Sequence, residues 1–353
     1  MKKYIIVFLF QLVACITFSQ APVNYYSQAE GKQSVELKTA LHNIIREHVY
    51  LSFTSNNSQL WWNEYYYKAD WHPDGYYWDM YSNDTYADYN GIRQNREHCM
   101  PRSWWGTASD YGQANDDLYN LYPSNAAANI AKSNYPLGLT QDERFNNQVT
   151  KVGTSTFSGY TSIVFEPADE YKGDFARTYM YMVTCYEDYS QKWRELSASM
   201  LNNNTFPVFN EYAVTLLVKW HRDDPVSEKE INRNNAVYGI QHNRNPFIDY
   251  PELAEYIWGN NKNEVWGITT GINETEKMKI SVIPNPAKTH IKISADFLDK
   301  ASYSIYGISG ILTQRDELLP QKEISIETLQ NGMYFCEITA DDMRSITKFL
   351  VNR

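Results

Sequence analysis

The chain carries the run Asn95-Arg96-Glu97-His98-Cys99-Met100-Pro101-Arg102-Ser103-Trp104-Trp105-Gly106. This run places a carboxylate, Glu97, directly beside an imidazole, His98. Adjacent side chains on a β-strand point to opposite faces, so both can serve one site only at a strand end or a bend. Two polar segments follow downstream: Asp117-Leu118-Tyr119-Asn120-Leu121-Tyr122-Pro123, and then Asn129 with Ser133-Asn134-Tyr135. We expect these segments to form one catalytic unit over residues 95–135.

Asn129 provides a second oxygen donor for this unit. It follows three alanines at 126–128, a short run that favours a helix. One carboxylate and one amide oxygen leave most positions of an octahedral ion to water and substrate phosphate, as is usual for Mg²⁺ in phosphate-handling sites. We therefore predict Glu97 and Asn129 as Mg²⁺ ligands, with Ca²⁺ or Mn²⁺ as substitutes.

These segments resemble the bacterial endonuclease I family of secreted, sugar-nonspecific nucleases. The resemblance rests on Asn-Arg-Glu-His-x-x-Pro-x-Ser-Trp, then on Asp-Leu-x-Asn-Leu-x-Pro…Asn…Ser-Asn-Tyr, with further matches at 165–177 and 241–249. It is specific because several segments agree in the right order. It implies an α+β fold, with a mixed catalytic domain over 21–270 and a ββα-metal (His-Me finger) active site.

The resemblance also implies a mechanism for phosphodiester hydrolysis. His98 takes a proton from the attacking water, and the metal on Glu97 and Asn129 binds the scissile phosphate and stabilises developing charge. Arg177 is expected to face the phosphate as a second catalytic residue, since a guanidinium gives bidentate charge stabilisation. The alternative for Arg177 is a structural ion pair with a nearby acid. The products expected from the family have 5′-phosphate ends.

Two features around His98 are expected to modify the site. Asn120 or Asp117 could orient the His98 ring. Relatives usually carry a histidine where this chain has Tyr119, and we place this position behind the site, so activity is still expected.

Because the contacts go to phosphates and sugars, both DNA and RNA are expected substrates, without sequence preference. His221 and His242 are not expected to bind the metal.

The charge balance excludes a strongly basic nucleic-acid binder. The net charge is −10; ten basic and eleven acidic residues lie in 272–353, and Lys2 and Lys3 add two positive charges in 1–20, which leaves −11 for 21–271. An acidic body is compatible with a nuclease that uses a cation and local arginines at its site. It predicts weak binding away from that site.

The N-terminus predicts export. Met1-Lys2-Lys3 followed by an apolar run over 4–18 is typical of a secretory signal peptide, assigned here to 1–20. A lipoprotein cleavage box ending at Cys15 is an alternative, although the apolar run continues beyond it. No later segment is long and apolar enough to span a bilayer. Cys99, Cys185 and Cys336 remain, and their number and spacing fit neither a disulfide framework nor a zinc pattern.

Periodicity predicts the elements around the site. Amphipathic or apolar helices are expected at 34–51, 178–186 and 211–220, and a segment with a polar run follows at 228–238. The stretch 61–90 is dense in Trp and Tyr and is predicted to form short strands and loops, with most rings in the core. A role for these rings in stacking on bases or sugars is the alternative.

After a polar linker at 271–279, the region 280–353 has a different pattern. Short alternating strands are predicted at 280–283, 291–294, 301–306, 324–326, 334–338 and 345–350, as in a small immunoglobulin-like sandwich. Its landmarks are Ile283-Pro284-Asn285-Pro286-Ala287, Tyr306-Gly307-Ile308-Ser309-Gly310, Leu329-Gln330-Asn331-Gly332-Met333-Tyr334-Phe335 and Lys348-Phe349-Leu350-Val351. They resemble the C-terminal sorting domain of the type IX secretion system, which implies export by that machinery in a Bacteroidetes-type bacterium. An ordinary binding sandwich is the alternative.

The sequence therefore predicts a secreted, monomeric, metal-dependent endonuclease. Two other classes stay open: an exported protein that binds glycan or nucleic acid without catalysis, and a phosphodiesterase for smaller esters. Loss of Glu97 or His98 would leave the binder functional, and polymer cleavage separates the two enzymes.

Overall fold

The structure is a computed structural model of the chain. It describes residues 21–54, 58–89, 91–106, 112–157, 160, 162–192, 195–267, 280–295, 301–308, 311–318, 323–340 and 343–353. Contacts divide the chain into two compact units, Met1–Ile268 and Thr269–Arg353. The signal peptide predicted at 1–20 and the linker predicted at 271–279 lie outside the described residues.

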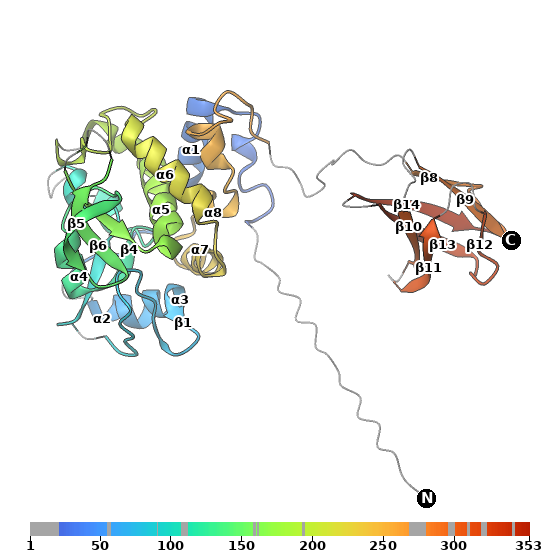
Figure 1. Cartoon of the computed structure of the whole chain (residues 1–353), viewed down its shortest axis with the longest axis horizontal. Coiled ribbons are helices and arrows are strands. Elements are labelled where there is room, and N and C mark those ends of the chain that lie inside the picture. The colour runs from blue at the N-terminus through green and yellow to red at the C-terminus, as the bar shows by residue number, and fades with distance from the viewer. Residues whose placement is uncertain are drawn as a thin grey trace, which may run out of the picture. The chain divides into compact units, whose positions relative to one another are not determined.

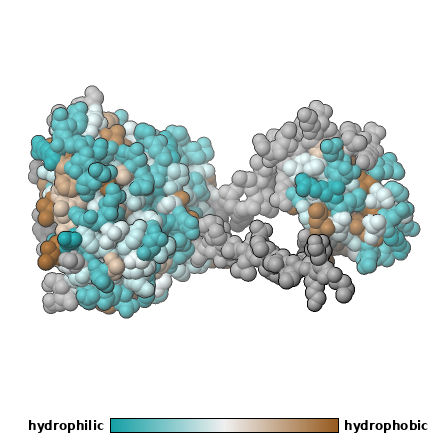
Figure 2. All heavy atoms as spheres, turned by 60° about the horizontal axis from the view of Figure 1, so that its bottom comes forward, coloured by the Kyte–Doolittle hydropathy of each residue, from teal (hydrophilic) through white to brown (hydrophobic). Residues whose placement is uncertain are grey.

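The first unit mixes helices with short antiparallel strands (Figure 1). Its α-helices are α1 (Ser34–Ile45), α2 (Ser58–Leu60), α3 (Tyr67–Ala69), α4 (Ala126–Lys132), α5 (Lys172–Cys185), α6 (Glu211–Asp223), α7 (Glu228–Gln241), α8 (Pro246–Asp249) and α9 (Leu253–Ile257). Short 3-10 turns lie at Ser27–Ala29, Arg102–Trp104, Gly112–Asn115, Asp169–Tyr171, Glu187–Lys192 and Glu195–Ser197. On the face shown in Figure 2, hydrophilic residues cover most of this unit, and hydrophobic ones form small separate spots.

Local sequence explains where the principal helices begin. Leu37, Leu41 and Ile45 recur every four residues in α1 and are fully buried, so this face packs on the core. The side chain of Asn210 accepts from the N–H of Ala213 at the start of α6. At α7, Ser227 and Glu230 satisfy each other's backbone N–H groups in a capping box. The helices predicted at 34–51, 178–186 and 211–220 are therefore confirmed, with shifted ends, and the segment at 228–238 lies in α7.

Helix α5 forms the core of the first unit. Every residue from Gly173 to Cys185 is buried, and the helix contacts α1, α6 and α8. Two of its buried residues, Asp174 and Arg177, are charged. A buried charge is costly unless it is paired, so each must find a partner on a neighbouring element.

The aromatic stretch differs in part from its prediction. Trp61–Tyr66 form a π-helical turn between α2 and α3, so the prediction of strands and loops is wrong for 61–69. The helix brings Trp61 against Tyr65, with ring centroids 5.2 Å apart. Trp61, Trp62 and Tyr66 have no exposed surface, which confirms the core role predicted for these rings.

The strands of the first unit pair antiparallel in three small sheets. β1 (Trp71–His72) pairs with β2 (Tyr76–Tyr77), β3 (Gln94–His98) with β4 (Leu121–Asn125), and β5 (Thr140–Asn146), β6 (Thr150–Ser155) and β7 (Ile163–Pro167) follow in order. In the β3–β4 pair, Glu97 lies opposite Tyr122 and His98 opposite Leu121. Helix α4 begins directly after β4, so two strands and a helix form one continuous β–β–α unit.

The second unit is all-β. Its strands are β8 (Ile280–Ile283), β9 (His290–Ala295), β10 (Ala301–Gly307), β11 (Leu312–Leu318), β12 (Glu323–Ser325), β13 (Gly332–Ala340) and β14 (Met343–Val351). They form two antiparallel sheets, ordered β11-β10-β13-β14 and β12-β9-β8, around a separate buried core. Strand β11 was not predicted, because it is a polar edge strand in which only Leu318 is buried.

Candidate active site

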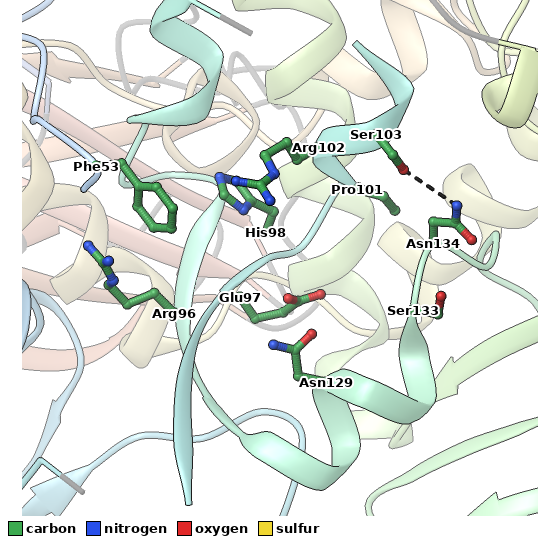
Figure 3. Close-up of a pocket in the computed structure, with 10 residues that line it drawn as sticks. All are labelled: Phe53, Arg96, Glu97, His98, Pro101, Arg102, Ser103, Asn129, Ser133 and Asn134. Atoms are coloured by element: carbon green, nitrogen blue, oxygen red, sulfur yellow. Dashed lines mark hydrogen bonds between the residues drawn. The ribbon is translucent and has the colours of Figure 1, made fainter. Parts of the chain in front are cut away.

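A pocket of about 430 Å³ opens beside the end of β3 (Figure 3). Its lining residues are Phe53, Arg96, Glu97, His98, Pro101, Arg102, Ser103, Asn129, Ser133 and Asn134. The predicted base and both predicted metal ligands therefore lie at one pocket. Most of its lining comes from the β–β–α unit and from the 3-10 turn at Arg102–Trp104.

The end of strand β3 explains how adjacent residues serve the same site. His98 is the last residue of β3, so the alternation of side chains ends there. Helix α4 supplies Asn129 from the other side, and its amide lies next to the Glu97 carboxylate in Figure 3. The start of α4 is fixed by Asn125, whose side chain accepts from the N–H of Ala128 at 2.9 Å.

The surroundings of His98 determine its tautomer. Its Nε2 lies 2.9 Å from the backbone carbonyl oxygen of Asn115. A carbonyl only accepts hydrogen bonds, so Nε2 carries the proton and Nδ1 keeps a free lone pair. The rings of Phe53 and Trp105 contact the imidazole edge-on, at centroid distances of 5.0 and 5.5 Å.

The protonation state of His98 suits a base. Burial lowers the pKa of His98 to about 3, and the positive charges of Arg102 and Lys132 act in the same direction. The imidazole is therefore neutral at pH 7. A neutral imidazole with a fixed proton on one nitrogen can accept a proton on the other.

Glu97 is held by a buried lysine. The Nζ of Lys132 donates to Glu97 Oε1 at 2.6 Å and to the backbone oxygen of His98 at 3.1 Å. Burial raises the pKa of Glu97, while the charge of Lys132 lowers it. The ion pair is thus a reason for this carboxylate to stay ionised in a buried position.

The donor set fits a hard divalent cation. Glu97 and Asn129 offer oxygen atoms, and no cysteine or second histidine lines the described pocket. Oxygen donors favour Mg²⁺, Ca²⁺ or Mn²⁺ over thiolate-seeking metals. The pocket volume leaves room for water and a phosphate group on the same ion.

The sequence model of the family described as Endonuclease I matches residues 33–252. The chain belongs to the endonuclease I family. It is 34% identical over 253 residues to an extracellular ribonuclease of Bacillus amyloliquefaciens, covering 69% of this chain and 81% of that protein. An extracellular ribonuclease of Bacillus subtilis (strain 168) is 34% identical over 242 residues, covering 66% and 78%. Endonuclease-1 of Buchnera aphidicola subsp. Acyrthosiphon pisum (strain APS) is 24% identical over 139 residues, covering 39% and 46%.

Family membership makes this protein a nuclease, and hence a phosphodiester hydrolase. A second family model, the secretion system C-terminal sorting domain, matches residues 281–352. Together with the extracellular relatives, this match shows that the endonuclease I domain is exported to the medium or the cell surface. Within the described ranges, the structure contains no helix that is long and apolar enough to cross a membrane.

Arg177, which was expected to face the phosphate, does not line the pocket at His98. Its side chain has almost no exposed surface, and its Nε and Nη2 donate to the two carboxylate oxygens of Glu230 at 2.5 and 2.8 Å. Its Nη1 donates to the backbone oxygen of Asp224 and lies 3.3 Å from His221 Nδ1. The structural ion pair considered for Arg177 is the arrangement present in this endonuclease I fold.

Asn120 and Asp117 do not contact the His98 ring. The Asn120 side chain accepts from the N–H of Met100 and donates to its carbonyl, so it fixes the turn after β3. Asp117 accepts from the hydroxyls of Tyr181 and Tyr186. The group that orients His98 is instead the backbone carbonyl of Asn115. Every residue has such a carbonyl, so the sequence does not indicate which one binds the ring.

Tyr119 is also remote from the pocket lining. Its hydroxyl donates to Asn234 Oδ1 at 2.5 Å and lies 3.1 Å from the carbonyl oxygen of Asn243, inside the core. This chain therefore has a hydrogen-bonding side chain at the position where the resemblance led us to expect a histidine. Its contacts support packing of α7 against the loop before β4.

Sequence reasoning missed two cations near the site: Lys132, which is buried and contacts Glu97 without lining the pocket, and Arg102, which lines it. Lys132 lies three residues after Asn129, a helical spacing that could have indicated a shared face. Arg102 is exposed at the pocket rim, four residues after His98, and could have been found as a cation within the motif.

Elsewhere, His48, Asp117 and Cys185 place possible ligand atoms within 4.8 Å of one another. Each has protein partners: His48 Nε2 lies 3.0 Å from Tyr186 Oη, and the Cys185 thiol faces the Ile45 carbonyl. Cys99 is buried, and burial raises the pKa of its thiol, as expected for a side chain that packs in the core. These groups do not line the pocket at His98.

Proposed function

We propose that the protein is a metal-dependent endonuclease that cleaves DNA and RNA and leaves 5′-phosphate ends. The observation that carries this proposal is the arrangement at one pocket of His98, with a free Nδ1, beside the oxygen donors Glu97 and Asn129. The β3–β4–α4 unit that holds them is assigned as the ββα-metal (His-Me finger) motif. The extracellular ribonuclease names of two relatives support RNA as one substrate.

The protein groups act on a water molecule and on the phosphodiester. Nδ1 of His98 takes a proton from the water, whose oxygen then forms the new bond to phosphorus. The bond between phosphorus and the 3′-oxygen breaks, and the 3′-oxygen takes a proton from solvent. Glu97 and Asn129 hold the Mg²⁺, which supplies charge neutralisation at the phosphate when bound.

We assign the phosphate-facing cation to Arg102 in place of Arg177. Arg102 lines the pocket and is exposed, and its charge acts on both Glu97 and His98. An arginine at this point can bind two phosphate oxygens at once. The position of the substrate in the pocket is then set by contacts to its phosphates, so cleavage requires no particular base sequence.

The domain assignment follows from the same reasoning. Residues 21–270 form the catalytic domain, 271–279 the linker and 280–353 a sorting domain with an immunoglobulin-like sandwich, while 1–20 are the signal peptide. The two antiparallel sheets of the second unit and its family match support this assignment. We infer that type IX secretion machinery of a Bacteroidetes-type bacterium is its partner, and that the enzyme acts as a monomer.

The test is cleavage of plasmid DNA and of total RNA by the chain from Ala21 onward, with Mg²⁺ and with EDTA. We expect cleavage only with metal, and a loss of about 10²–10⁴-fold in His98→Ala because the base is removed. His242→Asn is the matched control, since His242 is exposed and has a left-handed backbone that asparagine tolerates.

Product ends separate this mechanism from its main competitor. Hydrolysis by water leaves 5′-phosphates on both polymers. Cleavage of RNA alone, with 2′,3′-cyclic phosphate products, would mean attack by the ribose hydroxyl and would overturn the proposal. Full activity in EDTA, or in His98→Ala, would do the same.

A further inference from the structure

A buried lysine connects the two elements that carry the proposed metal ligands. Lys132 is the last residue of α4 and has no exposed surface. Its Nζ donates to Glu97 Oε1 at 2.6 Å and to the backbone oxygen of His98 at 3.1 Å. One side chain therefore joins α4 to both functional residues at the end of β3.

Helix α4 carries both a proposed metal ligand, Asn129, and this lysine. Asn129 and Lys132 are three residues apart in α4, a spacing that places them on one helix face. The start of α4 is capped by Asn125, and the β4 strand before it pairs with β3. The relative position of Asn129, Lys132 and Glu97 is thus fixed by backbone hydrogen bonds.

The hydrogen bond to Lys132 removes the main freedom of Glu97. The last torsion of a glutamate side chain has a broad distribution, so an unheld carboxylate rotates. Lys132 holds Oε1, and the backbone N–H of His98 also acts on this carboxylate, so we infer that Oε2 is the oxygen offered to an ion. Figure 3 shows the Glu97 carboxylate and the Asn129 amide turned toward each other at the pocket.

We propose that Lys132 is a positioning residue for the catalytic metal. It orients Glu97 so that Oε2 and the Asn129 amide oxygen bind the same divalent cation. The proposal rests on the proposed function, because it assumes Glu97 and Asn129 as the ligands. Lys132 itself contacts neither metal nor substrate.

A positioning role for Lys132 and a purely electrostatic effect of its charge predict opposite changes in metal affinity when the lysine is replaced. A lysine ammonium beside the ligand repels a cation, so on charge alone a neutral replacement should tighten metal binding. If Lys132 orients Glu97, the same replacement weakens binding, by about 10–100-fold as for other groups that support metal ligands. Lys132→Arg should retain most of the affinity, because a guanidinium can also donate to both acceptors.

The experiment measures Mn²⁺ binding to the chain from Ala21 onward without nucleic acid, from the loss of the free-ion EPR signal. Wild type, Lys132→Met, Lys132→Arg and Glu97→Gln are compared. Lys172→Met is the matched control, since Lys172 also pairs with carboxylates, those of Glu166 and Asp169, but does not line the pocket. Circular dichroism checks folding, and Lys132→Gln carries the test if Lys132→Met does not fold.

We expect weaker Mn²⁺ binding in Lys132→Met, near-normal binding in Lys132→Arg and Lys172→Met, and cleavage by Lys132→Met that recovers as Mn²⁺ is raised. Equal or tighter binding by folded Lys132→Met would overturn the positioning role and leave the metal assignment intact. Wild-type binding that is absent, or unchanged in Glu97→Gln, would instead overturn the metal assignment itself. The two failures are therefore distinguishable.

Discussion

At the scale of single residues, the site depends on which atom of each side chain is already engaged. His98 uses Nε2 on a backbone carbonyl and keeps Nδ1 for chemistry. Glu97 Oε1 accepts from Lys132, and we propose that Oε2 binds the ion. In both cases a neighbouring group engages one atom of the side chain, and the proposed chemistry uses the other.

Tyr119 provides a test of a buried hydroxyl in the loop before β4. Its buried hydroxyl bonds to Asn234 and lies close to the carbonyl of Asn243. We expect Tyr119→Phe to lower the free energy of unfolding by about 1–3 kcal/mol, because buried acceptors lose their donor. Urea denaturation measures this loss, and the folded variant should cleave plasmid at the wild-type rate. Slow cleavage with unchanged stability would place Tyr119 in the catalytic apparatus instead.

At the scale of elements, Arg177 joins three helices. It lies on α5, bonds to Glu230 on α7, and contacts His221 at the end of α6. The Nε2 of His221 lies 2.9 Å from the carbonyl oxygen of Pro251, so this nitrogen carries the proton and Nδ1 accepts from Arg177. The packing of these helices therefore requires a neutral His221.

The stability of this helix cluster should depend on pH. Burial lowers the pKa of His221 to about 4, helped by the charges of Arg177 and Arg222 and opposed by Glu255. The unfolded chain, with a histidine pKa of about 6.5, takes up the proton first, so stability is full above this pH and falls as the pH drops toward 4. Linkage gives a loss of about 2 kcal/mol between pH 7 and pH 5 from this residue.

His221→Gln removes the titrating group and can keep both hydrogen bonds. We expect its free energy of unfolding, from urea titrations at pH 7, 6 and 5, to fall less than that of wild type. Some acid sensitivity should remain, because His98 has a lowered pKa of the same sign. His242→Asn serves as the exposed control and should keep the wild-type slope. A slope in His221→Gln equal to that of wild type would contradict the buried neutral state.

At the scale of the whole molecule, the first unit extends beyond the residues matched by the family model. Trp266 is almost fully buried, and its backbone pairs with Lys32 and Gly31 near the start of the unit. Its ring contacts Tyr250 at a centroid distance of 5.4 Å. The segment after residue 252, which the family model does not cover, therefore packs on the core beside the segment at the start of the unit.

The burial of Trp266 predicts where the chain can be truncated without loss of stability. A chain of residues 21–267 should cleave nucleic acid and unfold at the same urea concentration as 21–353, because the two units have separate cores. Ending the chain at residue 260, or replacing Trp266 by alanine, should cost about 3–5 kcal/mol through the lost core side chain. Equal stability of 21–260 and 21–267 would show that Trp266 adds nothing.

The sequence by itself predicted several of the principal helices and the candidate ligands. Apolar residues predicted α1, α5 and α6, and the ordered motif predicted that Glu97, His98 and Asn129 share one pocket, because helix spacing and strand ends are local properties. Only the tertiary structure decided the partners of the buried charges. Arg177 pairs with Glu230, 53 residues away, and β11 lies at a sheet edge with little apolar pattern. Charge pairing and backbone acceptors such as Asn115 depend on which distant segments pack together, and no local pattern encodes that.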